Sequence, residues 1–206
     1  MTTAAHVRSL YGILSLGTKH RTFRDLQKST IQPSLHGHQV WQSSYMSMDY
    51  LLEFPLEKGS KIMEIGCGWG LLGIFCAKYF DSKVLLTDAD QGVFPYATAH
   101  LTLNNVSAQI QHISYEDLNE THFNQNDVIL GSDICFWPDM IEQLKDMIFR
   151  ALCSNVKKII ITDPGRMSFM RLAVHCQRNY DAELIRRKLS AKTNLDGYVL
   201  VINKPA

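Results

Sequence analysis

After residue 43, short apolar runs alternate with longer segments in which apolar residues recur at helical spacing. The short runs predict buried strands at residues 61–65, 83–87, 127–131 and 159–162, and a weaker strand at 108–114. The longer segments predict helices at residues 44–54, 71–80, 95–105, 140–151 and 169–176. Pro55 must end the first of these helices, because proline cannot continue the hydrogen-bond ladder.

Two further strand patterns close the chain, at residues 183–189 and 198–202, and the turn-forming stretch 194–197 joins them as an antiparallel pair. Residues 1–43 show no strong periodicity. Strands that alternate with helices over short links predict an α/β fold, with a parallel sheet, helices on both faces and an antiparallel edge. The length of 206 residues fits one domain. Ligands bind at the carboxyl ends of such strands, so the residues just after each strand are the candidates for function.

Composition narrows the class of protein. The net charge of +1 argues against a protein that binds polyanions in bulk, and no apolar run approaches the roughly 18 residues of a membrane span. Residues 29–156 carry 15 acidic and 6 basic side chains, which weakly favours a basic partner. The five cysteines form no Cys-x-x-Cys pair, as expected of reduced thiols in a cytoplasmic protein. His36 and His38 lack a third ligand, so no metal site is predicted.

A run of glycines follows the first predicted strand: Gly66, Gly68, Gly70 and Gly73. It satisfies both the dinucleotide fingerprint Gly-x-Gly-x-x-Gly and the Glu-x-Gly-x-Gly-x-Gly loop that binds S-adenosylmethionine (SAM). Glu64 favours SAM, because a carboxylate would repel a pyrophosphate but can accept a hydrogen bond from the methionine ammonium. Asp88 ends the next strand, where it can accept hydrogen bonds from the ribose hydroxyls of either cofactor.

A nicotinamide-dependent dehydrogenase would need a substrate domain or a Tyr-x-x-x-Lys motif beside the site. Tyr79 and Lys83 match that spacing but fall across a helix-to-strand link at the wrong end of the sheet. The chain instead resembles a class I, seven-β-strand SAM-dependent methyltransferase over residues 37–203. This resemblance implies a Rossmann-like three-layer sandwich, in which a mostly parallel seven-stranded sheet has a C-terminal antiparallel strand. It also implies one methyltransferase domain at 44–206, with residues 1–43 as an extension that covers the cofactor site.

The same resemblance assigns SAM binding to the glycine run and to residues near the strand ends: Trp41, Glu64, Gly66, Cys67, Gly68, Gly70, Asp88, Tyr115 and Ser132. Trp41 has two interpretations, because it could cover the methionine end of SAM or belong to the core.

The fourth predicted strand ends in Gly-Ser-Asp-Ile-Cys-Phe-Trp-Pro, where class I methyltransferases face the methyl acceptor. The segment lacks the (Asn/Asp)-Pro-Pro-(Tyr/Phe) motif of adenine and glutamine methyltransferases, and also the Pro-Cys pair used on pyrimidines. Asp133-x-x-Phe136 resembles the Asp-x-x-(Tyr/Phe) motif of methyltransferase family 16, the non-SET protein lysine methyltransferases. Phe136 replaces the commoner tyrosine of that motif but keeps the aromatic plane.

Three further segments resemble family 16. Gly37-x-x-x-Trp41 precedes the first predicted helix, as in the family. Ser114-Tyr115 follows the third strand, where the family usually has Thr-Trp. The segment Asp-Pro-Gly-Arg, residues 163–166, resembles the branch that methylates the electron-transfer flavoprotein β subunit.

This resemblance implies N-methylation of a protein lysine, with Asp133 orienting the amine and receiving its proton. Phe136 and Trp137 would line the alkyl stem and offer π faces to the cation. Other interpretations stay open: Asp133 could cap the helix after Pro138 or bind cofactor, Trp137 could be core, and Arg166 could brace its loop or bind phosphate. The chain could also methylate a small amine or an RNA, or be a non-catalytic SAM-binding partner protein.

Overall fold

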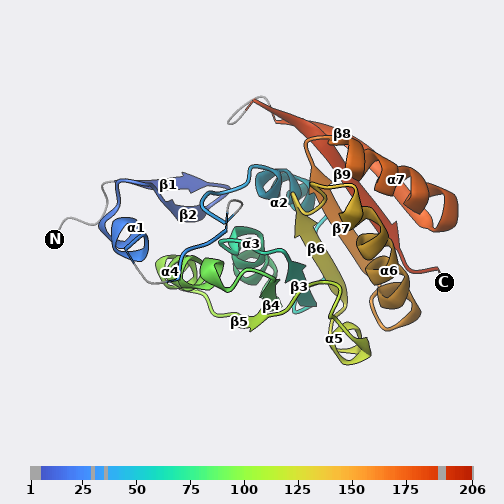
Figure 1. Cartoon of the computed structure of the whole chain (residues 1–206), viewed down its shortest axis with the longest axis horizontal. Helices are drawn as coiled ribbons and strands as arrows, with labels where there is room; N and C mark the ends of the chain where they lie inside the picture. Colours follow the sequence, from blue (N-terminus) through green and yellow to red (C-terminus); the bar gives the residue numbers. More distant parts are fainter. Residues whose placement is uncertain (1–5, 29–30, 35–36, 190–193, 206) are drawn as a thin grey trace.

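The computed structural model describes residues 6–28, 31–34, 37–189 and 194–205, and a seven-stranded sheet forms its centre (Figure 1). The strand order across the sheet is β5-β4-β3-β6-β7-β9-β8. Neighbouring strands are parallel except where β9 takes part. This sheet confirms the predicted fold. Its strands are β3 (Lys61–Ile65), β4 (Lys83–Asp88), β5 (Gln109–His112), β6 (Val128–Ser132), β7 (Lys158–Asp163), β8 (Asp181–Leu189) and β9 (Leu195–Asn203).

The C-terminal antiparallel strand lies inside the sheet and not at its edge. β9 pairs with β7 on one side and with β8 on the other, so β8 is the edge strand. The predicted turn at 194–197 is wrong, because β9 begins at Leu195 and Gly197 pairs with Arg187 inside the ladder. Gly197 serves close packing instead, since a Cβ there would lie 2.7 Å from the carbonyl oxygen of Asp163.

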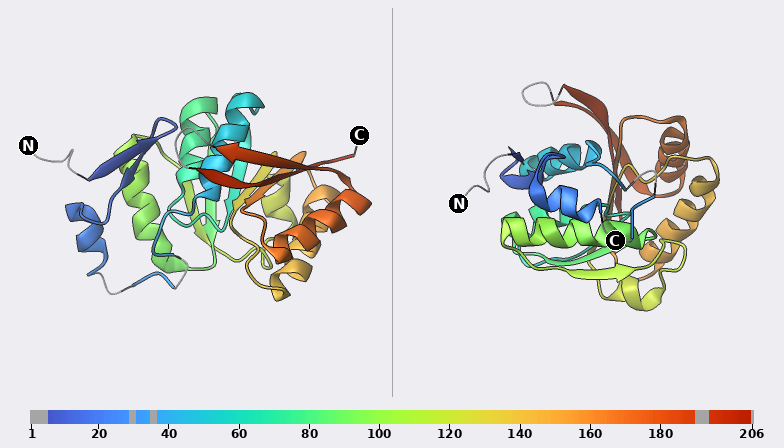
Figure 2. Two further views of the ribbon diagram at one scale, coloured as in Figure 1. Left: turned by 90° about the horizontal axis from the view of Figure 1, so that it is seen from above. Right: turned by 60° about the vertical axis from the view of Figure 1, so that its left-hand side comes forward.

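Helices cover both faces of the sheet (Figure 2). One face carries α2 (Ser43–Glu53), α3 (Leu71–Phe80) and α4 (Phe94–Asn104), the last preceded by the short 3₁₀ helix η1 (Gln91–Val93). The other face carries α5 (Glu120–Asn124), α6 (Asp139–Cys153) and α7 (Met167–Asn179). None of the helices in the described part of the chain is long and apolar enough to cross a membrane.

Each face of the sheet has its own apolar core, because consecutive strand residues point to opposite sides. On β3, Ile62 packs under α2 and α3, whereas Met63 packs under α6. On β7, Ile160 and Ile161 divide in the same way. These four side chains are at most 1% exposed. Burial on both faces explains why the central strands read as continuous apolar runs in the sequence.

Residues before α2 contain structure that the sequence analysis missed. The strands β1 (Val7–Leu10) and β2 (Ile13–Leu16) form a hairpin, and α1 (Arg21–Leu26) follows them. The hairpin is fastened to α4, where the Leu16 N–H donates to His100 Nε2 at 3.1 Å and the Leu14 N–H donates to Asn104 Oδ1 at 2.8 Å. Burial lowers the pKa of His100 to about 4, so its ring is neutral and can accept.

Candidate active site

A cleft of about 220 Å³ lies at the carboxyl ends of β3, β4 and β6. The strand order reverses at this point, since β3 lies between β4 and β6, and such a switch point opens a crevice for a ligand. A smaller pocket of about 30 Å³ adjoins it and shares Trp41, Gly66, Gly68 and Ser132 with the cleft. Most of the predicted site residues meet here: Trp41, Gly66, Gly68, Asp88, Tyr115, Ser132, Asp133 and Phe136 line the cleft, and Glu64 and Cys67 line the smaller pocket.

The glycine run turns the chain sharply between β3 and α3. Gly66, Gly68 and Gly70 have φ angles of 59°, 52° and 70°, a left-handed conformation that other residues seldom adopt. A Cβ on Gly68 would meet no atom within 4 Å, so this glycine faces open space in the cleft. Gly70 precedes α3 and packs against Leu86, and it is not among the cleft-lining residues of the described chain.

Two buried or half-buried carboxylates flank this loop and accept hydrogen bonds from main-chain N–H groups. Glu64 Oε2 accepts from Gly73 at 2.8 Å, and Asp88 Oδ2 accepts from Gly68 at 2.9 Å. Burial raises the pKa of Glu64 to about 8, and the neighbouring charge of Asp88 adds to the rise. Burial also raises the pKa of Asp88. A ligand that brings positive charge or hydroxyls would therefore stabilise the ionised form of both groups.

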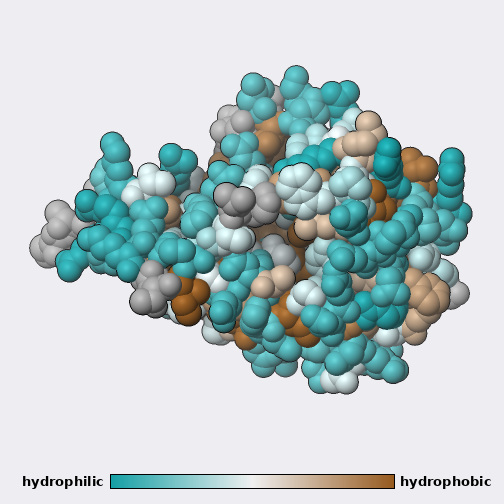
Figure 3. Space-filling view, in the orientation of Figure 1, coloured by the Kyte–Doolittle hydropathy of each residue, from teal (hydrophilic) through white to brown (hydrophobic). Residues whose placement is uncertain are grey.

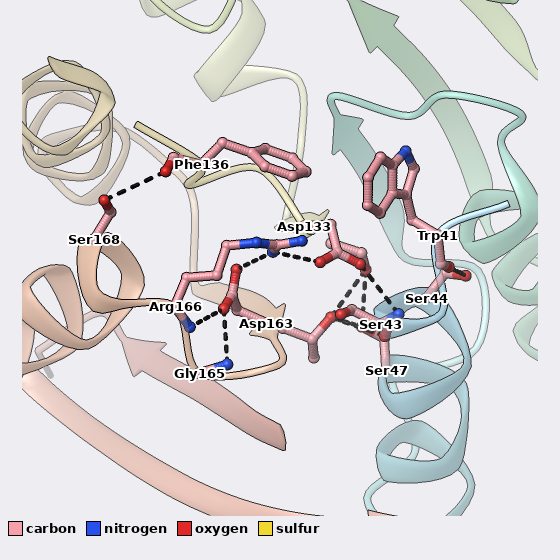
Figure 4. A network of polar contacts seen from close by, with 12 residues as sticks. Trp41, Ser43, Ser44, Ser47, Asp133, Phe136, Asp163, Gly165, Arg166 and Ser168 are labelled. Atoms are coloured by element: carbon pink, nitrogen blue, oxygen red, sulfur yellow. Dashed lines mark hydrogen bonds and ion pairs between the residues drawn. The ribbon is translucent and has the colours of Figure 1, made fainter. Parts of the chain in front are cut away.

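Asp133 lies at the opposite end of the cleft, just after β6, and its φ of 58° turns the chain out of the strand. The carboxylate Oδ1 accepts from Arg166 Nη1 at 2.6 Å, and Oδ2 accepts from the Ser43 N–H at 3.2 Å (Figure 4). Asp133 does not cap α6, because Pro138 occupies that position and makes no side-chain cap. The helix-cap interpretation of Asp133 is therefore wrong.

Arg166 braces the loop after β7, as one interpretation of the sequence had it. Its Nη1 atom bonds Asp163 as well as Asp133, and Asp163 Oδ1 accepts the N–H groups of Gly165 and Arg166 at 2.8 and 2.7 Å. The sequence analysis missed this bridge to Asp133. No local pattern signals it, because 33 residues separate the two partners.

An aromatic pair lines the cleft beside Arg166. The rings of Trp41 and Phe136 meet edge to face with centroids 5.1 Å apart, and the Arg166 guanidinium lies 4.0 Å from the Phe136 centroid. One face of Phe136 is therefore occupied by a cation of the chain itself. Trp137 is 57% exposed, so the core interpretation of this residue is wrong, and it is not among the described residues that line the cleft.

The segment before α2 crosses one side of the cleft, and Ser34, Gly37 and Trp41 contribute to its lining. The Ser34 N–H donates to Asp90 Oδ2 at 2.5 Å, and the Trp69 indole donates to the Gly37 carbonyl at 2.9 Å. Ser34 and Asp90 were not predicted, because their contact spans 56 residues.

Two weak signals of the sequence concern other chemistry. His36 lies outside the described residues, and within the described ranges no three His, Cys, Asp or Glu side chains gather as a metal site would require. Tyr79 lies in α3 and Lys83 begins β4, so they do not share a helix.

A family model described as lysine methyltransferase matches residues 24–171. The chain is 30% identical over 141 residues to the histidine protein methyltransferase 1 homolog of Dictyostelium discoideum. This alignment covers 64% of this chain and 45% of that protein. It is 25% identical over 161 residues to the electron transfer flavoprotein beta subunit lysine methyltransferase of Xenopus laevis, which covers 78% and 63%. The chain thus spans about half to two-thirds of the length of these relatives.

Among solved structures, the precorrin-6y C5,15-methyltransferase from Geobacter metallireducens GS-15 superposes with a TM-score of 0.60. The sequences are 12% identical, and the match covers 85% of this chain and 94% of that chain. At this identity the likeness shows a shared fold, which is the Rossmann-like methyltransferase fold.

Proposed function

Because this chain belongs to the lysine methyltransferase family, we propose that it is a SAM-dependent N-methyltransferase that acts on a lysine side chain of a protein. The family match confirms the resemblance inferred from the sequence motifs. One observation carries the proposal: a single cleft is lined by Gly68 and Asp88 at its β4 end, and by Asp133 and Phe136 at its β6 end, on the other side of β3. A donor and an acceptor bound at these two ends would meet within the cleft.

The cofactor end fits SAM, which the family and fold imply as methyl donor. Gly68 leaves open space for a ligand against the backbone, and Asp88 lines the cleft with its carboxylate. When bound, SAM would supply an electrophilic methyl group on a sulfonium. We propose that Asp88 accepts hydrogen bonds from the ribose hydroxyls and that Glu64 accepts a hydrogen bond from the methionine ammonium. The other predicted contacts that line the cleft or the adjoining pocket would complete the binding site: Trp41, Gly66, Cys67, Tyr115 and Ser132. Gly70 would act indirectly, by shaping the turn before α3.

The acceptor end supplies alignment and charge. Transfer of a methyl group is an in-line displacement, so the incoming amine must be held on the axis of the bond that breaks. We propose that Asp133 orients this amine and takes its proton, or passes it to water. Phe136 would line the alkyl stem on the ring surface that faces the cleft, and Trp137 would contact the substrate outside it.

The N-terminal part of the chain has a role in this proposal. We propose that residues 1–43 are an extension that covers the cofactor site of a methyltransferase domain at 44–206. Ser34, Gly37 and Trp41 support this, because they line the cleft. A cytoplasmic location is likewise proposed, in agreement with the free thiols of all five cysteines.

The experiment that tests the function is incubation of the purified protein with tritium-labelled SAM and cell extract. We expect label that survives ribonuclease and is lost to protease, followed by amino-acid analysis that finds methyl-lysine. Asp133→Asn provides the control, because it should bind SAM and transfer little label.

Each other outcome points to another function. Label lost to ribonuclease would indicate an RNA methyltransferase, and label in a small molecule an amine methyltransferase. Methyl-histidine would indicate that the acceptor is histidine, the residue in the name of the Dictyostelium relative. SAM binding without transfer to any fraction would indicate a non-catalytic SAM-binding protein.

A further inference from the structure

A cation that belongs to the chain lies at the acceptor end of the cleft. Arg166 Nη1 is 2.6 Å from Asp133 Oδ1 and 2.7 Å from Asp163 Oδ2 (Figure 4). Both carboxylates are deeply buried, with side chains 3% and 1% exposed, whereas the Arg166 side chain is 25% exposed. A single nitrogen atom is therefore the shared counter-ion of two buried acids.

The loop after β7 is built to hold this arginine. Asp163 accepts the main-chain N–H groups of Gly165 and Arg166 with the oxygen that does not bond the guanidinium. The resulting turn directs the Arg166 side chain back to Asp133, and its guanidinium lies 4.0 Å from the Phe136 centroid. Arg166 thus contacts Asp133 and Phe136, two of the residues that line the acceptor end of the cleft.

Resting on the proposed function, we propose that Arg166 is a positioning residue, which balances the charge of Asp133 and Asp163 and fixes Asp133 and Phe136 at the acceptor end. Two carboxylates that share a buried site cannot both stay ionised without a cation, so one takes up a proton. In the native protein the guanidinium removes that need. Without it, the two acids would hold a proton between them, and the pair would be a weaker proton acceptor for the substrate amine.

Other ionisable groups around the cluster do not replace Arg166. Cys135 faces Asp163 and Arg166 from the loop after β6, and burial raises its pKa to about 11, so the thiol is neutral. Tyr198 on β9 packs against Gly165. From α2 the cluster receives the uncharged N–H of Ser43.

The first test measures thermal stability against pH in the ligand-free protein, so it does not depend on any methyl transfer. Arg166→Gln removes the charge, and the carboxylate pair then binds a proton that it releases as the pH rises. We expect the loss of Tm relative to the native protein to grow as the pH rises above the ordinary carboxyl range. Adding Asp163→Asn should abolish this growth, because the amide oxygen still accepts the two N–H groups but carries no charge.

A gap in Tm that stays constant with pH would overturn the proposal and leave Arg166 as a loop brace. Arg166→Lys is the matched control, because it keeps a cation on the loop and should show no growing gap.

The second test uses the labelled acceptor. Arg166→Gln should lower kcat about 10- to 100-fold at neutral pH while the Kd of SAM stays within a few-fold. Asp163→Asn in the same chain should recover most of kcat, which a purely structural role would not allow. If the stability test succeeds and no acceptor is labelled, the proposed function fails and the charge role of Arg166 stands. If labelling occurs and Asp163→Asn brings no recovery, the positioning role fails.

Discussion

The two ends of the cleft handle buried acid in opposite ways. At the cofactor end, Glu64 and Asp88 accept main-chain N–H groups, and no lysine or arginine of the described residues pairs with either. At the acceptor end, Asp133 and Asp163 share the cation of Arg166. At the cofactor end, positive charge or hydroxyl groups must therefore come from a ligand, whereas the acceptor end has its counter-ion within the chain.

The difference has a consequence for binding. A ligand that brings positive charge to the cofactor end stabilises the ionised forms of Glu64 and Asp88. Its binding should therefore be coupled to proton release, and its affinity should depend on these two carboxylates. A ligand at the acceptor end meets a cluster whose charges Arg166 already balances. Asp133 and Asp163 should therefore affect the rate of transfer more than the affinity for the ligand. Figure 3 shows a hollow in the middle of the surface, bordered by mixed polar and apolar residues.

Asp133→Asn should give the largest effect. It keeps the shape of the side chain but removes the charge that orients the amine, so turnover should fall about 100- to 10,000-fold, about 3–5 kcal/mol of transition-state stabilisation. SAM affinity should stay within a few-fold, because Glu64 and Asp88 are at the other end. Steady-state kinetics and calorimetry on one preparation separate the two quantities. Loss of SAM binding would place Asp133 in the cofactor site, and a melted fold would make it structural.

Asp88→Ala should give the next effect, on cofactor affinity. The variant loses charge-assisted hydrogen bonds worth about 1.5–3 kcal/mol, so the Kd of SAM should rise about 10- to 150-fold. Asp88→Asn is the matched control, because one oxygen remains to accept the Gly68 N–H at the position of Oδ2. Calorimetry should also find no binding of NAD. Unchanged SAM affinity in Asp88→Ala, or NAD binding by the native protein, would contradict the assignment.

The fold could be predicted where the evidence is local. Lys61–Ile65 and Leu71–Phe80 have the predicted bounds, because a strand buried on both faces is a continuous apolar run and glycines mark its end. The β1–β2 hairpin could not be predicted, because its position depends on contacts with distant residues. Its strands have four residues each, β1 is largely exposed, and bonds to His100 and Asn104 hold it from 84 and 90 residues away.

The site divides in the same way. The glycine run encodes its own backbone conformation, so the sequence alone could place Gly66 and Gly68 at the turn that lines the cleft. Asp133 could be placed at a strand end, but its partners could not be foreseen. Ser43 is 90 residues away and Arg166 is 33 away, and only the completed sheet brings them together. The counter-ion of Asp133 comes from a distant segment, and spacing in the sequence does not encode that contact.

The pH dependence of SAM binding should give the smallest effect, and it tests directly whether Glu64 binds the ammonium of SAM. Burial raises the pKa of Glu64 to about 8, so near neutral pH the free protein holds a proton there. An ammonium that binds Glu64 favours the carboxylate, so binding must release that proton. SAM affinity should therefore rise with pH by up to about tenfold per unit from about pH 6 to about pH 8. Above that range, the rise should end because Glu64 is already ionised in the free protein, and affinity should fall as the α-amino group loses its own charge.

Calorimetry at about pH 6.5 in two buffers of different ionisation enthalpy counts the released protons directly, and about one proton per SAM is expected. Glu64→Gln should release none and should bind with little dependence on pH. Stability of the free protein provides an independent check on the same group. Because the folded pKa of Glu64 lies above its ordinary value of 4.5, its contribution to stability is full below that value and is lost as the pH rises through about 8. Buffer-independent binding heats in the native protein would show that Glu64 does not receive the cation, and the ammonium would then have to be bound elsewhere in the cleft.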